Sequence, residues 1–161
     1  MTQLTLDAEA LYADLRDGVR GLMRPGSALV GIWSGGAWLA ERLQRDLGLA
    51  GSPGVISSTL HRDDFGSRGL AGSDPTQLPF AVDDRHIVLI DDVLYTGRTI
   101  RAVVNELFDF GRPASVTLAV LVDRGGRELP ISADVAGMQM DLAPGEQVKL
   151  TGPAPLGLSV K

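Results

Sequence analysis

The chain has 161 residues, a formal net charge of −5 and no cysteine, and 44% of its residues are hydrophobic. This length predicts one domain, residues 1–161, with a sizeable core, and the acidic balance argues against broad electrostatic attraction to nucleic acid. The lack of cysteine excludes disulfides, thiolate metal sites and cysteine nucleophiles, and no apolar run approaches the ~20 residues that a membrane span needs.

An amphipathic helix is predicted from Ala8 to Met23, with Asp7 as its N-cap and Pro25-Gly26 ending the pattern. Three arginines four residues apart form a basic stripe on it: Arg16, Arg20 and Arg24. The stripe is either a solvated face paired with neighbouring aspartates or a contact surface for RNA or another subunit. Residues 1–9 lack the basic flank and apolar core of a signal peptide, so we expect a cytoplasmic protein.

A strand, a glycine loop and a helix follow in that order. The strand is predicted from Ala28 to Trp33 and the helix from Ala37 to Leu47, with Gly48 at its C-terminal end. Between them lie Ser34, Gly35 and Gly36. Backbone amides in such a loop can form a concave anion site at a helix start, although a Ser-Gly-Gly turn alone is more often structural.

A long irregular segment follows the next predicted strand, Val55 to Leu60. Residues 61–84 contain several glycines and prolines and little helical pattern. Loops of this length inside a compact domain are usually functional lids or binding loops. The alternative is a disordered polar insert.

The clearest motif occupies residues 88–100. His86 to Ile90 is predicted as a buried strand, two carboxylates follow it, and a helical pattern begins at Arg98. Open α/β sheets bind ligands at the carboxyl ends of their strands. The free amides and dipole of the helix start suit a phosphate, as do the residues around it: Thr96, Gly97, Arg98 and Thr99.

The two carboxylates, Asp91 and Asp92, suit another part of the ligand. They repel a phosphate, but they can accept hydrogen bonds from sugar hydroxyls or hold a magnesium ion through water. A phosphate site beside two such acceptors matches a ribose 5-phosphate. Acid pairs at strand ends also occur in phospho-acceptor receiver domains, but those lack a Thr-Gly-x-Thr sequence five residues further on.

Polar residues also follow the next buried strand, Ser115 to Val122, in the segment Asp123 to Pro130. Because several predicted strands end in polar groups, we expect one active site at one edge of the sheet. Three short strands complete the predicted elements: Ala133 to Met140, Gln147 to Leu150 and Leu156 to Val160.

The four apolar positions, two acids and Thr-Gly-Arg-Thr resemble the phosphoribosyl pyrophosphate (PRPP) motif of type I phosphoribosyltransferases. The resemblance implies an α/β fold with a central, mostly parallel sheet flanked by helices, a flexible lid at about residues 61–84 and a small base-binding hood. Residues 91–99 and 122–130 resemble the members that join uracil transfer to the regulation of pyrimidine genes. The likeness spans roughly Leu29 to Val148, and Tyr95, where purine-using relatives often carry Asp, fits a smaller pyrimidine base.

The implied reaction converts uracil and PRPP to UMP and pyrophosphate, with Mg²⁺ as cofactor. Asp91 and Asp92 would hold the ribose hydroxyls, directly or through water on the magnesium ion. The 5-phosphate would contact the motif residues Tyr95, Thr96, Gly97, Arg98 and Thr99. The pyrophosphate would contact the loop Ser34, Gly35 and Gly36, and the lid residue Arg62, whose planar guanidinium suits a phosphate.

The uracil edge would meet backbone groups of Val122, Asp123 and Arg124, because a carbonyl–NH–carbonyl pattern suits main-chain partners. Asp123 either assists loss of the uracil proton or caps a turn within a salt bridge. Two positions depart from the family pattern. Gly35 stands where many members have a basic residue, and Gly126 stands where a histidine is frequent.

Three functions are therefore weighed: a uracil phosphoribosyltransferase, a nucleotide-sensing regulator with little turnover, and a transferase for another base. Members of the resembled group bind messenger RNA when UMP is bound. With only two lysines in the chain, the candidates for an RNA contact are Arg16, Arg20, Arg24, Arg124 and Arg127. The resemblance also implies a homodimer or homotetramer.

Overall fold

The computed structural model describes residues 4–57 and 76–161. Arg62 and most of the predicted lid, as well as the second half of the strand predicted from Val55 to Leu60, lie outside these residues. No helix within the described ranges is long and apolar enough to cross a membrane.

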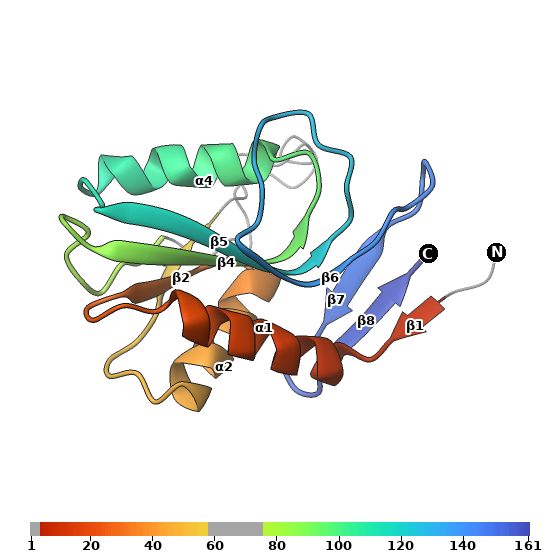
Figure 1. The fold of residues 1–161 in the computed structure, drawn as a ribbon, viewed down its shortest axis with the longest axis horizontal. Helices are drawn as coiled ribbons and strands as arrows, with labels where there is room; N and C mark the ends of the chain where they lie inside the picture. Colours follow the sequence, from red (N-terminus) through yellow and green to blue (C-terminus); the bar gives the residue numbers. More distant parts are fainter. Residues whose placement is uncertain (1–3, 58–75) are drawn as a thin grey trace.

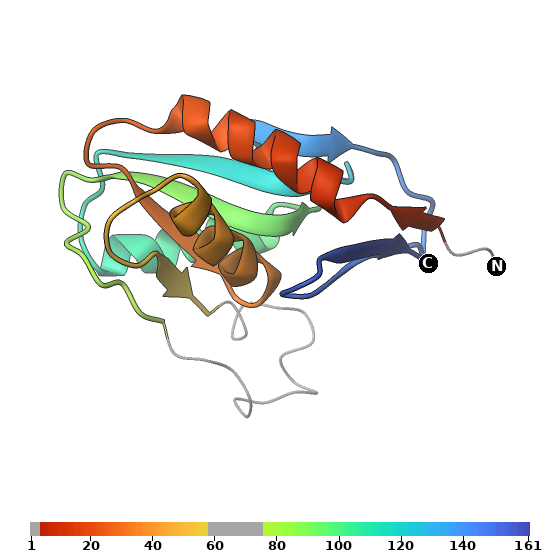
Figure 2. The same ribbon diagram turned by 90° about the horizontal axis from the view of Figure 1, so that it is seen from below.

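The central element is a parallel sheet in the order β3-β2-β4-β5-β6. Its strands are β2 (Ala28–Ile32), β3 (Gly54–Ile56), β4 (His86–Leu94), β5 (Ser115–Asp123) and β6 (Val135–Gln139). Helices α1 (Ala8–Leu22) and α2 (Gly35–Asp46) lie side by side on one face, and α4 (Arg98–Asp109) covers the other (Figures 1 and 2). The predicted fold, a mostly parallel sheet flanked by helices, is confirmed.

The continuous apolar runs of β4 and β5 follow from this layering, because both faces of the sheet are buried. Along β4, Val88 and Ile90 join the core under α1 and α2, whereas Ile87 and Leu89 join the core under α4. Since β4 pairs with β2 on one side and β5 on the other, its carboxyl end lies at the centre of the sheet edge.

A second, antiparallel sheet stands beside the first in the order β1-β8-β7 (Figure 1). Its strands are β1 (Leu4–Leu6), β7 (Val148–Thr151) and β8 (Gly157–Val160). We call this sheet the hood. The sequence pattern predicted β7 and β8 within a residue or two. It did not predict β1, whose three residues are too few to show an alternation.

Two predicted boundaries are wrong in ways that matter for the site. Helix α2 begins at Gly35 rather than Ala37, so both glycines of the loop belong to its first turn. Strand β4 continues beyond Ile90 to Leu94, because Asp91 pairs with Val120 and Leu94 with Asp123 of β5. The acid pair therefore lies within the strand and not after it.

Candidate active site

The acid pair lies at the carboxyl end of β4. Asp91 is 5% exposed, and its Oδ1 accepts a hydrogen bond of 2.8 Å from the Asp92 amide. The Asp92 Oδ1 accepts one of 2.8 Å from the Val93 amide. Both side chains line a cavity of about 320 Å³. The cavity is also lined by Val93, Tyr95, Thr99, Arg124, Gln147 and Val148.

The Ser34–Gly36 loop packs against this acid pair, as the sequence predicted for a shared site. A β-carbon on Gly35 would lie 2.5 Å from the Asp92 Oδ2, and one on Gly36 would collide with the Ile90 carbonyl oxygen. Strand backbone therefore excludes a β-carbon at Gly36, whereas a β-carbon at Gly35 would displace the Asp92 side chain. Gly35 and Asp92, which are distant in sequence, thus become direct neighbours.

The predicted phosphate site is the start of α4. Gly97 precedes the helix with a φ of 93°, and no side chain caps the first turn at that position. The Arg98 amide donates to the Thr96 Oγ1 over 3.2 Å, and Thr99 lines the cavity. Gly97 itself supplies no cap, and the Thr96 hydroxyl occupies only the Arg98 amide. The amides that follow in the first turn, next to two hydroxyl groups, can bind an anion.

The side chain of Arg98 is engaged within the protein, because its Nε forms a 2.8 Å ion pair with Glu128. Glu128 and Leu129 in turn donate backbone hydrogen bonds of 2.9 and 3.1 Å to the Thr96 carbonyl. The segment after β5 therefore supports the loop between β4 and α4, where the phosphate site is predicted. The Arg98 side chain thus links the start of α4 to this segment, and its backbone amide is hydrogen-bonded to Thr96.

Arg127 is the second part of this support. Its guanidinium donates to the Asp123 Oδ2 over 2.6 Å, to the Tyr95 carbonyl over 2.8 Å and to the Ile131 carbonyl over 2.7 Å. A fourth, longer contact of 3.5 Å reaches the Gly125 carbonyl, so Arg127 holds this loop together through four partners within the protein. These contacts occupy N–H groups that the predicted RNA contact would need.

Asp123 is 9% exposed, and both of its oxygens have partners. Oδ1 accepts from the Gly125 amide over 3.0 Å, and Oδ2 accepts from Arg127. Burial raises the pKa of Asp123, but the hydrogen bonds and positive charge of Arg127 together with the Gly125 amide hold it below its usual value. The residue lines a different cavity, of about 460 Å³, from the acid pair. Of the two predicted roles, this geometry favours a turn-capping, salt-bridged aspartate.

Arg124 and Tyr95 form a stacked pair on the wall of the acid-pair cavity. The guanidinium carbon lies 3.9 Å from the ring centroid, a cation–π contact. The Arg124 Nε is buried and has no hydrogen-bond partner within the described residues. A β-carbon on Gly126 would collide with the Tyr95 ring, so glycine at this position makes room for the stacked pair.

Two residues of the cavity, Gln147 and Val148, were not predicted as site residues. Gln147 and Lys161 exchange both backbone hydrogen bonds, at 2.9 and 3.0 Å. Val148 pairs with Val160 at the next position of this antiparallel ladder, so its N–H and C=O point away from β8. Only the strand register reveals these main-chain groups, because nothing in the side chain of a valine marks them.

Comparison with known proteins gives a consistent result. A family model described as phosphoribosyl transferase domain matches residues 8–151. The bifunctional protein PyrR of Nitrosococcus oceani is 54% identical over 165 residues, covering 98% of this chain and 93% of the relative. The PyrR of Pseudomonas aeruginosa is 53% identical over 143 residues, covering 88% and 83%.

Among solved structures, a hypoxanthine-guanine phosphoribosyltransferase from Bacillus anthracis superposes with a TM-score of 0.66 at 15% identity, covering 91% of this chain and 86% of that one. This likeness shows the fold. The family model and the curated relatives together show that the chain belongs to the phosphoribosyltransferase family and, within it, to the PyrR group.

Proposed function

We propose that the protein transfers the 5-phosphoribosyl group of PRPP to uracil, giving UMP and pyrophosphate, and that the same pocket senses UMP in the control of pyrimidine genes. One observation carries the proposal. A single cavity brings together the acid pair of β4, Thr99 at the start of α4 and the outer edge of β7, and the glycine loop packs against the acid pair.

In the phosphoribosyl half of the reaction, the bond between C1 of the ribose and the pyrophosphate oxygen breaks. A bond from C1 to N1 of uracil forms, and the N1 proton is released. Positive charge develops on the ribose ring as the leaving group departs. The carboxylates of Asp91 and Asp92 hold the ribose hydroxyls and stabilise that charge, while the α4 start fixes the 5-phosphate.

The residues of this site fit a magnesium ion that arrives bound to the phosphates of PRPP. The described residues contain no cluster of three or more His, Asp or Glu side chains that could hold a metal ion. Mg²⁺ usually keeps several waters and binds through one or two carboxylates plus substrate phosphates, and Asp91 and Asp92 offer such carboxylates. When bound, the ion would neutralise charge on the departing pyrophosphate.

The pyrophosphate itself is proposed to contact the backbone of Gly35 and Gly36, and Arg62 is proposed to approach it from the lid.

In the base half, the edge of β7 suits uracil. The N–H and C=O of Val148 point away from β8 and offer one donor and one acceptor, which complement adjacent carbonyl and N–H groups of the uracil ring. The buried Nε of Arg124 offers a second donor. Of the three predicted uracil contacts we propose Arg124, because it lines the cavity, whereas Val122 is fully buried and Asp123 lines the other cavity.

The RNA-binding half of the proposal rests on the arginine stripe of α1. Arg16 and Arg20 both pair with Asp17, at 3.3 and 3.4 Å, on the exposed side of the helix. These exposed pairs are weak, so a phosphate backbone can compete for both arginines. Arg24 lies just after the helix.

We further propose one domain, residues 1–161, acting in the cytoplasm as a homodimer or homotetramer.

The first experiment is an assay with radiolabelled uracil, PRPP and Mg²⁺. We expect labelled UMP that depends on PRPP and Mg²⁺, and no product with hypoxanthine or guanine. Product from another base alone would overturn the uracil assignment. If the protein instead binds pyrimidine leader RNA only when UMP is present, and makes no UMP, the result would favour a regulator without turnover. The observation that supports this alternative is Gly35, which leaves the pyrophosphate loop without a basic side chain.

A further inference from the structure

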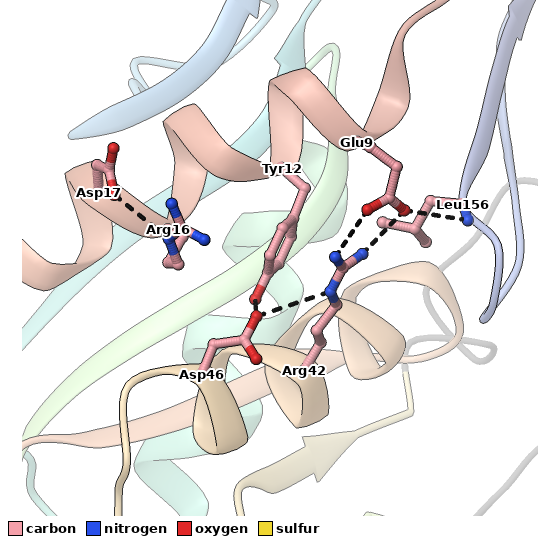
Figure 3. Close-up of polar contacts among 7 residues, drawn as sticks. All are labelled: Glu9, Tyr12, Arg16, Asp17, Arg42, Asp46 and Leu156. Atoms are coloured by element: carbon pink, nitrogen blue, oxygen red, sulfur yellow. Dashed lines mark hydrogen bonds and ion pairs between the residues drawn. The ribbon is translucent and has the colours of Figure 1, made fainter.

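A cluster of four side chains joins α1 and α2 (Figure 3), the two helices on the face of the sheet opposite α4 (Figure 1). The Arg42 guanidinium binds both carboxylate oxygens of Glu9, at 2.7 and 2.9 Å. It also lies 3.9 Å over the ring of Tyr12. The Tyr12 hydroxyl donates to the Asp46 Oδ2 over 2.6 Å, and the Arg42 Nε lies 3.7 Å from that same oxygen.

The cluster also reaches the hood. Glu9 Oε2 accepts a hydrogen bond of 3.4 Å from the amide of Leu156, in the turn between β7 and β8. Leu156 itself is buried in the core that α1 and α2 share. On the other side of this turn, a β-carbon on Gly152 would lie 3.2 Å from the Trp38 ring of α2. The hood is therefore fastened to both helices at the end of β7 that lies away from the cavity.

Helix α2 and strand β7 lie near this cluster, and each carries a different part of the proposed site. Helix α2 begins with Gly35 and Gly36, which pack against the acid pair. Strand β7 begins with Val148, preceded by Gln147, and both residues line the acid-pair cavity. A rotation of the hood on α2 would move the edge of β7 relative to the acid pair without changing the parallel sheet.

We propose that Glu9 and Arg42 form a clasp that sets the position of the β7 edge over the acid pair, and that both are positioning residues for the base and not for PRPP. This inference rests on the proposed function. The chemistry of the pair suits the task, because a bidentate arginine–carboxylate contact fixes orientation as well as distance. The aromatic ring of Tyr12 restrains the guanidinium from a third side.

The charge states of the cluster support a fixed geometry at neutral pH. The hydrogen bond from Arg42 lowers the pKa of Glu9, so the carboxylate stays charged. Burial and the hydrogen bond to Asp46 raise the pKa of Tyr12, so the hydroxyl stays protonated and keeps donating. The side chains of Glu9 and Arg42 are 48% and 31% exposed, and ion pairs so exposed add little to global stability.

The test compares Arg42→Met and Glu9→Ala with the conservative variant Arg42→Lys and the control Asp17→Ala. Asp17 lies on the same helix as Glu9, is exposed, and forms ion pairs with two arginines of that helix. We expect the KM for uracil to rise about tenfold in Arg42→Met and Glu9→Ala, with the KM for PRPP nearly unchanged. Arg42→Lys should recover part of the loss, and Asp17→Ala should behave like the wild type.

Hydrogen exchange of the backbone amides provides a readout that needs no activity. In Arg42→Met, the amides of β7 and β8 should exchange faster, while those of β4 remain as protected as in the wild type. Unchanged exchange in the hood would overturn the clasp even in an active enzyme. Faster exchange with equal rises in both KM values, or with none, would overturn its role in placing the base.

The two proposals fail in different ways. A wild-type protein that makes no UMP refutes the proposed function, and the clasp itself is then judged by hydrogen exchange alone. A wild-type protein that makes UMP, together with variants whose uracil KM is unaltered, refutes the clasp alone.

Discussion

Gly35 at the start of α2 lies directly against the carboxylate of Asp92 in β4, so that a β-carbon at position 35 would come within 2.5 Å of the Asp92 Oδ2. The contact joins the proposed pyrophosphate loop to the acid pair. Its neighbour Gly36 instead faces backbone, the carbonyl of Ile90 and the α-carbon of Asp91. Two adjacent glycines are therefore required for different reasons, one next to a movable side chain and one next to a fixed strand.

Alanine should lower stability at position 36 and activity at position 35. Gly36→Ala should lower the free energy of unfolding by about 2 kcal/mol, because strand backbone cannot move aside. Gly35→Ala should leave stability nearly unchanged but displace the Asp92 carboxylate, lowering kcat/KM roughly tenfold. Urea unfolding and the uracil transfer assay measure the two effects. Equal loss of stability in both variants would contradict the assignment of the two neighbours.

Asp92→Asn should remove nearly all UMP formation while the protein stays folded. The amide keeps the size of the side chain and an oxygen that accepts the 2.8 Å hydrogen bond from the Val93 amide. It loses the negative charge that stabilises the developing positive charge on the ribose, an electrostatic loss of about 10²–10³ in kcat. Single-turnover rates and a thermal unfolding curve are the measurements. A variant with wild-type turnover would refute the assignment of the acid pair.

Thr99 provides a test of the phosphate site. Thr99→Val keeps the shape of the side chain but removes the hydroxyl at the first turn of α4, so the KM for PRPP should rise roughly tenfold or more, the effect of losing one hydrogen bond to a charged group. Thr99→Ser keeps the hydroxyl and serves as the control, with a KM near that of the wild type. The KM for uracil should change little in either variant, and a selective effect on uracil would contradict the placement of the 5-phosphate.

The Asp123–Arg127 contact should show in the pH dependence of stability. Because the folded state holds the pKa of Asp123 below its usual value, the contact contributes fully above the unfolded pKa of about 3.9 and is lost as the pH falls through the lower folded value. Asp123→Asn should therefore cost about 2 kcal/mol at pH 7, and the difference from the wild type should shrink below pH 4.

Urea unfolding of both proteins at pH 7 and pH 3 measures that difference. A gap that stayed the same at pH 3, or widened there, would show that the Asp123 carboxylate is not stabilised by its partners. Glu128→Gln, which changes a carboxylate in an exposed ion pair, serves as a control with a small effect at either pH.

Much of the fold could be predicted from local patterns. The apolar spacing and the Asp7 cap define α1, and the Asp7 carboxylate does accept the Ala10 amide over 3.1 Å. The continuous apolar runs of β4 and β5 identify two strands buried on both faces. The acid pair and the Thr-Gly-Arg-Thr sequence lie close together in one loop and strand, so their shared position could be predicted without knowing any long-range contact.

The parts that could not be predicted depend on contacts between distant residues. Arg127 and Glu128 contact the loop between β4 and α4 only because the segment after β5 folds back onto it. The end of β4 at Leu94 depends on its pairing with β5, which outweighs the poor strand propensity of two aspartates. The contact between Glu9 and Arg42 joins two helices whose charged residues each look like ordinary solvated positions.

The outward-facing backbone of Val148 has a consequence for how such a protein changes its substrate. A recognition surface built from peptide groups keeps the same donor and acceptor for every amino acid except proline, which lacks the N–H. A shift in base preference would instead have to come from neighbours that tilt or slide the strand, or from Gln147 and Arg124 beside it. The choice of base in this pocket would then depend on where the strand lies more than on which side chain residue 148 carries.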